Sequence, residues 1–131
     1  MANPALAIFR KAVKGLVYMS EKDAPFRVVA LKCDTAPTKP TIAQLLDLPE
    51  DSPVEEVAFT KFFAELTKGE KWHAEDDKAV VKRYQTLLAT LRETLTHLHV
   101  FKIGRVRVKI AIVGQSADGH WVGLETDSLE T

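Results

Sequence analysis

Three patterns in the sequence predict an α+β sandwich, with helices on both faces of a mixed, largely antiparallel sheet that ends in a C-terminal meander. Apolar residues recur at helical spacing within residues 4–14 and 76–98. From residue 101 onward, apolar positions alternate with charged ones, as in strands with one packed face. Asp118-Gly119 is typical of a tight turn that joins two such strands.

The size and charge of the chain limit what it can be. Its 131 residues, 46% of them hydrophobic, suffice for one core, so we expect a single domain over 1–131. Basic and acidic residues are equal at 18 each, which leaves no global field to hold a nucleic acid and no acidic excess that would mimic one. Cys33 has no second cysteine to pair with, and no apolar run approaches membrane-spanning length, so we expect a cytoplasmic protein.

The first element is predicted to be an amphipathic helix over residues 4–14. Asn3 supplies a helix-capping oxygen, Pro4 suits the first turn, and Gly15 supplies the stop. The apolar face consists of Leu6, Phe9 and Val13.

The middle of the chain is predicted to alternate between short strands and short helices. Residues 26–32 read as a strand that a proline-bearing segment ends. Thr41 with Gln44 resembles a capping box, which opens a brief helix through Leu46. A strand over 54–58 follows, and then a helix over 60–67 with Thr60 as its candidate N-cap.

The last third is predicted to be one long helix and three strands. A leucine-rich stripe predicts the helix over 76–98, with acidic residues at its N-terminal end. Two strands follow within 101–112, and His120–Thr126 is the returning strand. Residues 125–131 resemble a frayed tail. The charged face of the two strands carries Lys102, Arg105, Arg107 and Lys109.

No catalytic constellation is visible in the sequence. His97 and His99 are either two metal ligands or surface histidines at a helix end, and no further ligand stands at a zinc-like spacing. The basic stripe Lys102–Lys109 is either a phosphate-binding face or the solvated side of a sheet, and no aromatic residue interleaves it for base stacking. We therefore expect neither an enzyme nor a metal-binding protein.

Ser20, Glu21 and Lys22 form a polar segment between an apolar run, Leu16–Met19, and Phe26. A loop that is anchored on both sides loses little further entropy when a partner docks on its tip. Glu21 is thus either a solvated loop acid or a presented group. Trp72, within hydrophilic residues 68–75, either covers a neighbouring helix or anchors an interface.

These segments also resemble a known family. The residues that carry the resemblance are Leu16 with Tyr18-Met19-Ser20-Glu21 and Pro25-Phe26, Trp72 with Glu75-Asp76-Asp77 and Ala79-Val80-Val81, Ile112-Val113-Gly114, Gly119, Gly123 and Glu130-Thr131. Together they resemble the nuclease A inhibitor family of bacterial proteins over nearly all of residues 4–131, and least across 33–53.

The resemblance implies a three-layer α/β/α sandwich that inhibits a metal-dependent, sugar-nonspecific DNA/RNA endonuclease. It implies that Glu21 coordinates the catalytic Mg²⁺ of the nuclease, supported by the Trp72 loop and by Thr131 with its α-carboxylate. It implies no cofactor, no metal in the free protein, no direct nucleic-acid or membrane partner, and a monomer when free. Lys71 departs from the acidic residue often found before the tryptophan, so an interaction module of the same fold with another partner remains the alternative. The predicted partner-binding residues are Ser20, Glu21, Lys22, Lys71, Trp72, His73 and Thr131.

Overall fold

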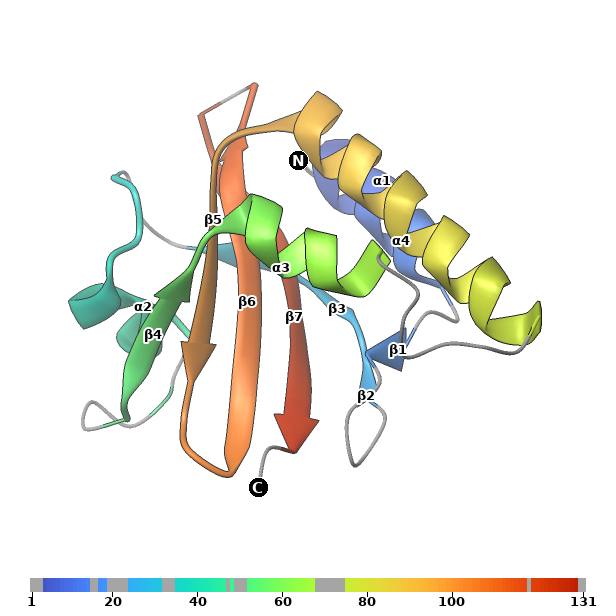
Figure 1. The fold of residues 1–131 in the computed structure, drawn as a ribbon. Helices are drawn as coiled ribbons and strands as arrows, with labels where there is room; N and C mark the ends of the chain where they lie inside the picture. Colours follow the sequence, from blue (N-terminus) through green and yellow to red (C-terminus); the bar gives the residue numbers. More distant parts are fainter. Residues whose placement is uncertain are drawn as a thin grey trace.

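A five-stranded antiparallel sheet forms the centre of the fold (Figure 1). The computed structural model describes residues 4–14, 17–18, 24–31, 35–46, 48, 52–67, 75–117 and 119–129. In sheet order the strands are β3 (Arg27–Leu31), β7 (Trp121–Leu129), β6 (Arg107–Ser116), β5 (Leu95–Ile103) and β4 (Val54–Val57). The α+β class is confirmed. All four strand pairs are antiparallel, so the mixed pairing expected from the sequence is not found among the described strands.

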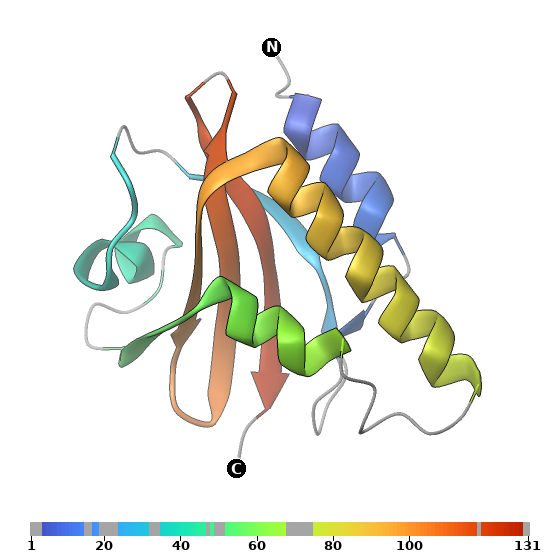
Figure 2. The same ribbon diagram turned by 45° about the horizontal axis from the view of Figure 1, so that its top comes forward.

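Three helices pack on one face of this sheet (Figure 2). They are α1 (Pro4–Val13), α3 (Phe59–Thr67) and α4 (Glu75–Thr94). The predicted apolar face of α1 is confirmed, because Phe9 and Val13 are buried and Leu6 packs against the same core. Burying one such side chain contributes about 1.5–3 kcal/mol to stability. The core on this face comprises Phe9, Val13, Phe26, Phe62, Phe63, Tyr84, Leu87, Leu91, Leu95, Val100, Val108, Ile110, Ile112, Val122 and Leu124.

Among the described elements, the opposite face carries one short helix, α2 (Lys39–Leu45), on the side of the sheet away from α4 (Figure 2). Ile42 and Ala43 of this helix belong to a second core. Its other buried members are Leu31, Phe101, Ile103, Ala111, Val113 and Trp121. No described helix is both long and apolar enough to cross a membrane.

The central strand β6 is buried on both faces, which corrects the expectation that one of its faces is charged. Ile110 and Ile112 face the three-helix core, whereas Ala111 and Val113 face the second core. All four are at most 1% exposed. The alternation of apolar and charged residues in β6 therefore ends at Lys109. The next residue on that face is the small, uncharged Ala111, which is buried.

The two short helices begin earlier than the sequence predicted. The N-cap of α2 is Thr38, whose backbone N–H donates to the hydroxyl of Thr41 at 2.9 Å, so Thr41 is the third helical residue rather than the cap. Helix α3 begins at Phe59, and the Ala58 carbonyl accepts its first backbone hydrogen bond, from Phe62. Thr60 therefore lies inside the helix and is not its cap.

The long helix ends four residues earlier than predicted, because the chain passes directly from α4 into β5. Leu95 pairs with Ser116 of β6 rather than continuing the leucine stripe. His97 has a φ of 54°, and the pairing of β5 with β6 shifts between Thr96 and His99. The spacing of Leu91 and Leu95 fits both a helix and the start of a buried strand, so periodicity alone could not find this boundary.

The predicted hairpin between β6 and β7 is confirmed, and β7 is longer than expected. Gly119 has a φ of 88°, which favours glycine, and its N–H donates to the Ser116 carbonyl at 2.9 Å. Strand β7 continues to Leu129, which pairs with Arg107. Residues 125–129 are therefore not a frayed tail but part of the sheet. Cys33 lies outside the described residues.

Candidate functional site

The structure describes the elements that flank the predicted partner-binding residues. These residues, Ser20, Glu21, Lys22, Lys71, Trp72, His73 and Thr131, all lie outside the described part of the chain. The described residues next to each segment therefore outline the candidate site.

A short two-stranded stem carries residues 19–23. Strands β1 (Val17–Tyr18) and β2 (Ala24–Pro25) pair antiparallel, with Tyr18 opposite Ala24. Paired residues of this kind have Cα atoms about 4.5–5.5 Å apart. The two ends of the predicted glutamate segment are therefore held side by side, as expected for the base of a hairpin.

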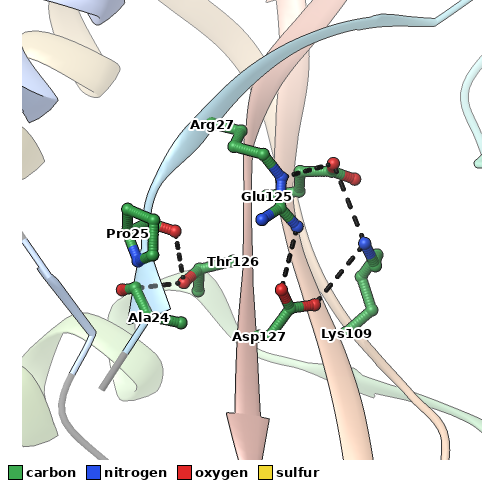
Figure 3. A network of polar contacts seen from close by, with 7 residues as sticks. All are labelled: Ala24, Pro25, Arg27, Lys109, Glu125, Thr126 and Asp127. Atoms are coloured by element: carbon green, nitrogen blue, oxygen red, sulfur yellow. Dashed lines mark hydrogen bonds and ion pairs between the residues drawn. The ribbon is translucent and has the colours of Figure 1, made fainter.

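A buried threonine fixes this stem to the last strand of the sheet (Figure 3). Thr126 of β7 is completely buried, and its hydroxyl donates to the carbonyl of Pro25 at 3.0 Å and lies 3.4 Å from that of Ala24. Both β1 and β2 contact β7. Sequence reasoning missed Thr126, although a threonine two residues after Leu124, on the buried face of a strand, is itself a signal that a hydroxyl has a buried partner.

Charged side chains join β7 to β3 and β6 on the opposite face of the sheet (Figure 3). Arg27 donates from Nε to Glu125 Oε1 and from Nη2 to Asp127 Oδ2, each at 3.0 Å. The ammonium of Lys109 lies 3.8 Å from Glu125 Oε1 and 3.5 Å from Asp127 Oδ1. The network links β3, β7 and β6 beside the stem.

The balance of burial and charge shifts two pKa values in this network. Partial burial alone would raise the pKa of Asp127, but hydrogen bonding and the charge of Arg27, with the charge of Lys109, outweigh it and lower that pKa. Partial burial likewise disfavours the charged form of Arg27. The hydrogen bonds and charges of Glu125 and Asp127 outweigh this effect, so the pKa of Arg27 is raised. Because the side chains of Arg27 and Asp127 are 41% and 49% exposed, the pair that they form contributes about 1 kcal/mol or less.

Helix α4 is tied to the chain that leads into the stem. Arg83 donates from Nη2 to the carbonyls of Ala12 and Lys14, at 3.1 and 2.8 Å, and so binds α4 to the C-terminal end of α1. The ring of Tyr84 packs edge-on against Phe26, with 6.2 Å between centroids. Residues 68–74, which include Trp72, connect α3 to this fixed helix.

The flanks of the three predicted segments share one end of the molecule. The β1–β2 stem, the start of α4 and the C-terminal end of β7 all lie in the lower half of Figures 1 and 2, opposite the β6–β7 turn. Register explains the first and third: Arg27, just after the stem, pairs with Glu125, and β7 then runs to Leu129. Segments that are far apart in sequence are thus attached to one region.

The two alternative sites fit the structure poorly. His97 and His99 lie on β5 rather than at a helix end, and His99 Nδ1 is 3.0 Å from Glu56 Oε2. Within the described ranges, no group of three or more His, Cys, Asp or Glu side chains could hold a metal ion. The exposed His120 precedes β7, and His73 lies outside the described residues.

The basic stripe does not form one face, contrary to the sequence prediction. In the pairing of β5 with β6, Lys102 lies opposite Ile110, which belongs to the three-helix face. Lys109 lies opposite Ile103, which belongs to the other face. Lys109 is also paired with the carboxylates of β7. Only Arg105 and Arg107 remain as exposed neighbours, which is too few for a phosphate-binding track.

One comparison with known proteins finds a match. A family model described as nuclease A inhibitor-like protein matches residues 3–131, nearly the whole chain. No curated protein matches the chain.

Proposed function

The chain belongs to the nuclease A inhibitor-like family, and from this membership we propose that it inhibits a Mg²⁺-dependent, sugar-nonspecific endonuclease by occupying its active site. A family of inhibitors implies a nuclease as the protein partner. In the proposed complex, Glu21 presents its carboxylate to the catalytic ion, the Trp72 loop packs on the rim, and Thr131 adds its α-carboxylate.

The observation that carries the proposal is the family match across residues 3–131. The described geometry supports it, because the stem at Tyr18 and Ala24 contacts β7, and the stem, the start of α4 and the end of β7 all lie in the lower half of the fold in Figure 1. A single partner could therefore contact all three segments. The ion pairs and the Thr126 hydroxyl that join β2 and β3 to β7 support a preorganised site.

The chemistry of a blocked active site needs few residues of the inhibitor. A metal-dependent nuclease uses its ion to polarise a phosphate oxygen, and Mg²⁺ prefers hard oxygen ligands. A carboxylate can replace the scissile phosphate at the ion and offers no bond to cleave. Inhibition then needs one placed oxygen donor and a complementary rim, so the zero net charge of this chain is compatible with it.

The proposal also covers the remaining properties of the inhibitor. It is one nuclease-inhibitor-like domain over 1–131, cytoplasmic and monomeric when free. It has no catalytic activity, and it binds neither a cofactor, a metal ion, a membrane nor a nucleic acid.

A second candidate is an interaction module of the same fold with a partner other than a nuclease. Lys71 is the residue that favours it, because the position before the tryptophan is often acidic in the family that this chain resembles. A changed charge next to an anchor residue alters which partner surface is complementary.

Titration of purified sugar-nonspecific endonucleases with this protein distinguishes the two candidates. An inhibitor of the proposed kind gives a sharp equivalence point with at least one nuclease of a broad panel that includes any nuclease from its own source. If every member of the panel keeps its activity, the interaction-module candidate replaces the inhibitor.

A further inference from the structure

Two arginines and a valine form an exposed tip at the turn between β5 and β6. Arg105, Val106 and Arg107 are all exposed. Val106 is 53% exposed, and the other exposed large hydrophobic side chain of the described residues, Ile8, lies far away on α1. A single exposed valine is ordinary on a protein surface, whereas arginine is enriched at protein interfaces, so the two arginines that flank Val106 are the stronger sign of a contact surface.

The backbone of this tip is fixed before any partner binds. Gly104 has a φ of 116°, and a Cβ atom built there would lie 2.3 Å from the carbonyl oxygen of Arg107. The Gly104 N–H donates to the Pro53 carbonyl at 2.9 Å, and Ile103 pairs with Lys109 just before the turn. A preformed turn loses little conformational entropy on binding.

Strand register brings the tip next to the proposed nuclease contact at the C-terminus. Arg107, the first residue of β6, pairs with Leu129, the last residue of β7, and the β5–β6 turn and the C-terminal end of β7 lie at the lower end of the sheet in Figure 1. Thr131 follows Leu129 by two residues in the sequence, and two residues span at most about 7 Å. A stable interface covers about 800 Å² on each partner. A partner surface of that size at Thr131 is large enough to cover the tip as well.

The charges around the tip favour a protein over a nucleic acid as its partner. Among the described residues, Arg105 and Arg107 form no ion pair, whereas Lys109 is engaged by the carboxylates of β7. Two free cations neutralise only about two phosphates, which supports weak, salt-sensitive binding. Arginine beside an apolar side chain is instead enriched at protein interfaces.

We propose that Arg105, Val106 and Arg107 form a second docking element, which contacts the inhibited nuclease at an apolar surface bordered by carboxylates. The proposal rests on the proposed function and extends the interface beyond Glu21, Trp72 and Thr131. The two arginines attract the nuclease and set its orientation, while Val106 leaves water on binding.

A charge-reversed variant with a matched control tests this proposal. Arg105→Glu/Arg107→Glu is compared with Arg10→Glu/Lys11→Glu, which makes the same change in net charge at two exposed residues of α1. The dissociation constant is measured with a purified sugar-nonspecific endonuclease that the parent protein inhibits. Circular dichroism and the midpoint of thermal unfolding report whether each variant folds. A third variant, Val106→Ser, tests the apolar contact without a change of charge.

The proposal predicts that the tip reversal weakens binding at least about tenfold, chiefly through slower association at low salt, and that the α1 reversal changes it less than about twofold. Val106→Ser weakens binding at both low and high salt. Equal dissociation constants for the parent and the folded tip variants overturn the tip proposal alone. If the parent inhibits no nuclease, the proposed function fails, and the tip proposal falls with it. The parent is also tested with a labelled DNA duplex. If the parent binds the duplex and Arg105→Glu/Arg107→Glu does not, the tip is a nucleic-acid contact and the proposal of a protein partner is overturned.

Discussion

The carboxylate of Glu21 is the single group on which the proposed mechanism depends most. Glu21→Gln keeps the size and shape of the side chain but removes the charge that a divalent ion requires. We expect a loss of about 2 kcal/mol or more in binding to the Mg²⁺-loaded nuclease, as for a hot-spot residue, and a loss of less than about 0.5 kcal/mol in the free energy of unfolding. Titration calorimetry and urea denaturation measure the two quantities.

Trp72→Ala is the control for this variant. Its effect on binding arises from lost packing, so it persists when the nuclease is stripped of Mg²⁺, whereas most of the Glu21 effect disappears with the metal. If Glu21→Gln binds the metal-loaded nuclease as tightly as the parent does, chelation is not the mechanism.

Thr126 is the residue that ties the glutamate-bearing stem to the sheet. Thr126→Val removes the buried hydroxyl and leaves the Pro25 carbonyl without this donor, so we expect the free energy of unfolding to fall by about 1–2 kcal/mol. Thr126→Ser, which keeps the hydroxyl and loses a methyl group, retains the hydrogen bond. Urea denaturation of the two variants measures the difference. A stability for Thr126→Val equal to that of the parent would show that the hydrogen bond contributes nothing.

At the scale of elements, the ion-pair network of β3, β6 and β7 makes stability depend on pH. The folded-state pKa of Asp127 is lower than its ordinary value of 3.8, so its contribution is complete above that value and is lost as the pH falls through the folded-state pKa. We expect Asp127→Asn to cost less than about 1 kcal/mol at pH 7, because the side chain is half exposed. The difference from the parent shrinks below about pH 4. Chemical denaturation at several pH values checks this, and a difference that is constant with pH would refute it.

At the end of β7, Leu129 has a structural role, whereas Thr131 has a proposed role in binding. Leu129 is held by its pairing with Arg107, whereas Thr131 is the terminal residue of the given sequence. Removal of Thr131 is therefore expected to weaken nuclease binding without lowering the midpoint of thermal unfolding. An unchanged dissociation constant would reject a role for Thr131.

Local patterns predicted some elements better than others. Helix α1 and the β6–β7 hairpin were found because their signals, an apolar face after Pro4 and a glycine in the turn, are local. The junction of α4 and β5 was not found, because the leucines fit a helical stripe equally well and the strand forms by pairing with β6, which is distant in sequence. The double burial of β6 depends on α2, which no local pattern places on the second face.

At the scale of the whole molecule, the sequence identified the candidate segments, and the fold explains how one partner could reach them all. Nothing in residues 16–26 predicts that the stem lies beside the end of β7, because this proximity depends on the pairing of Arg27 with Glu125. The clamp by Thr126 and the tie from Arg83 to α1 are also contacts between distant parts of the chain. The isolated sequence shows such residues but not their partners.

Steady-state kinetics of an inhibited nuclease test the central claim, occupation of the active site, most directly. The initial rate of DNA cleavage is measured against substrate concentration at several concentrations of this protein, with Mg²⁺ present. The account predicts that, once inhibitor, nuclease and DNA have equilibrated, the apparent dissociation constant of the inhibitor rises in proportion to the DNA concentration, and that inhibition is complete at one equivalent when DNA is scarce. An apparent dissociation constant that does not change with the DNA concentration, or residual activity at excess inhibitor, would contradict the claim that the protein fills the active site.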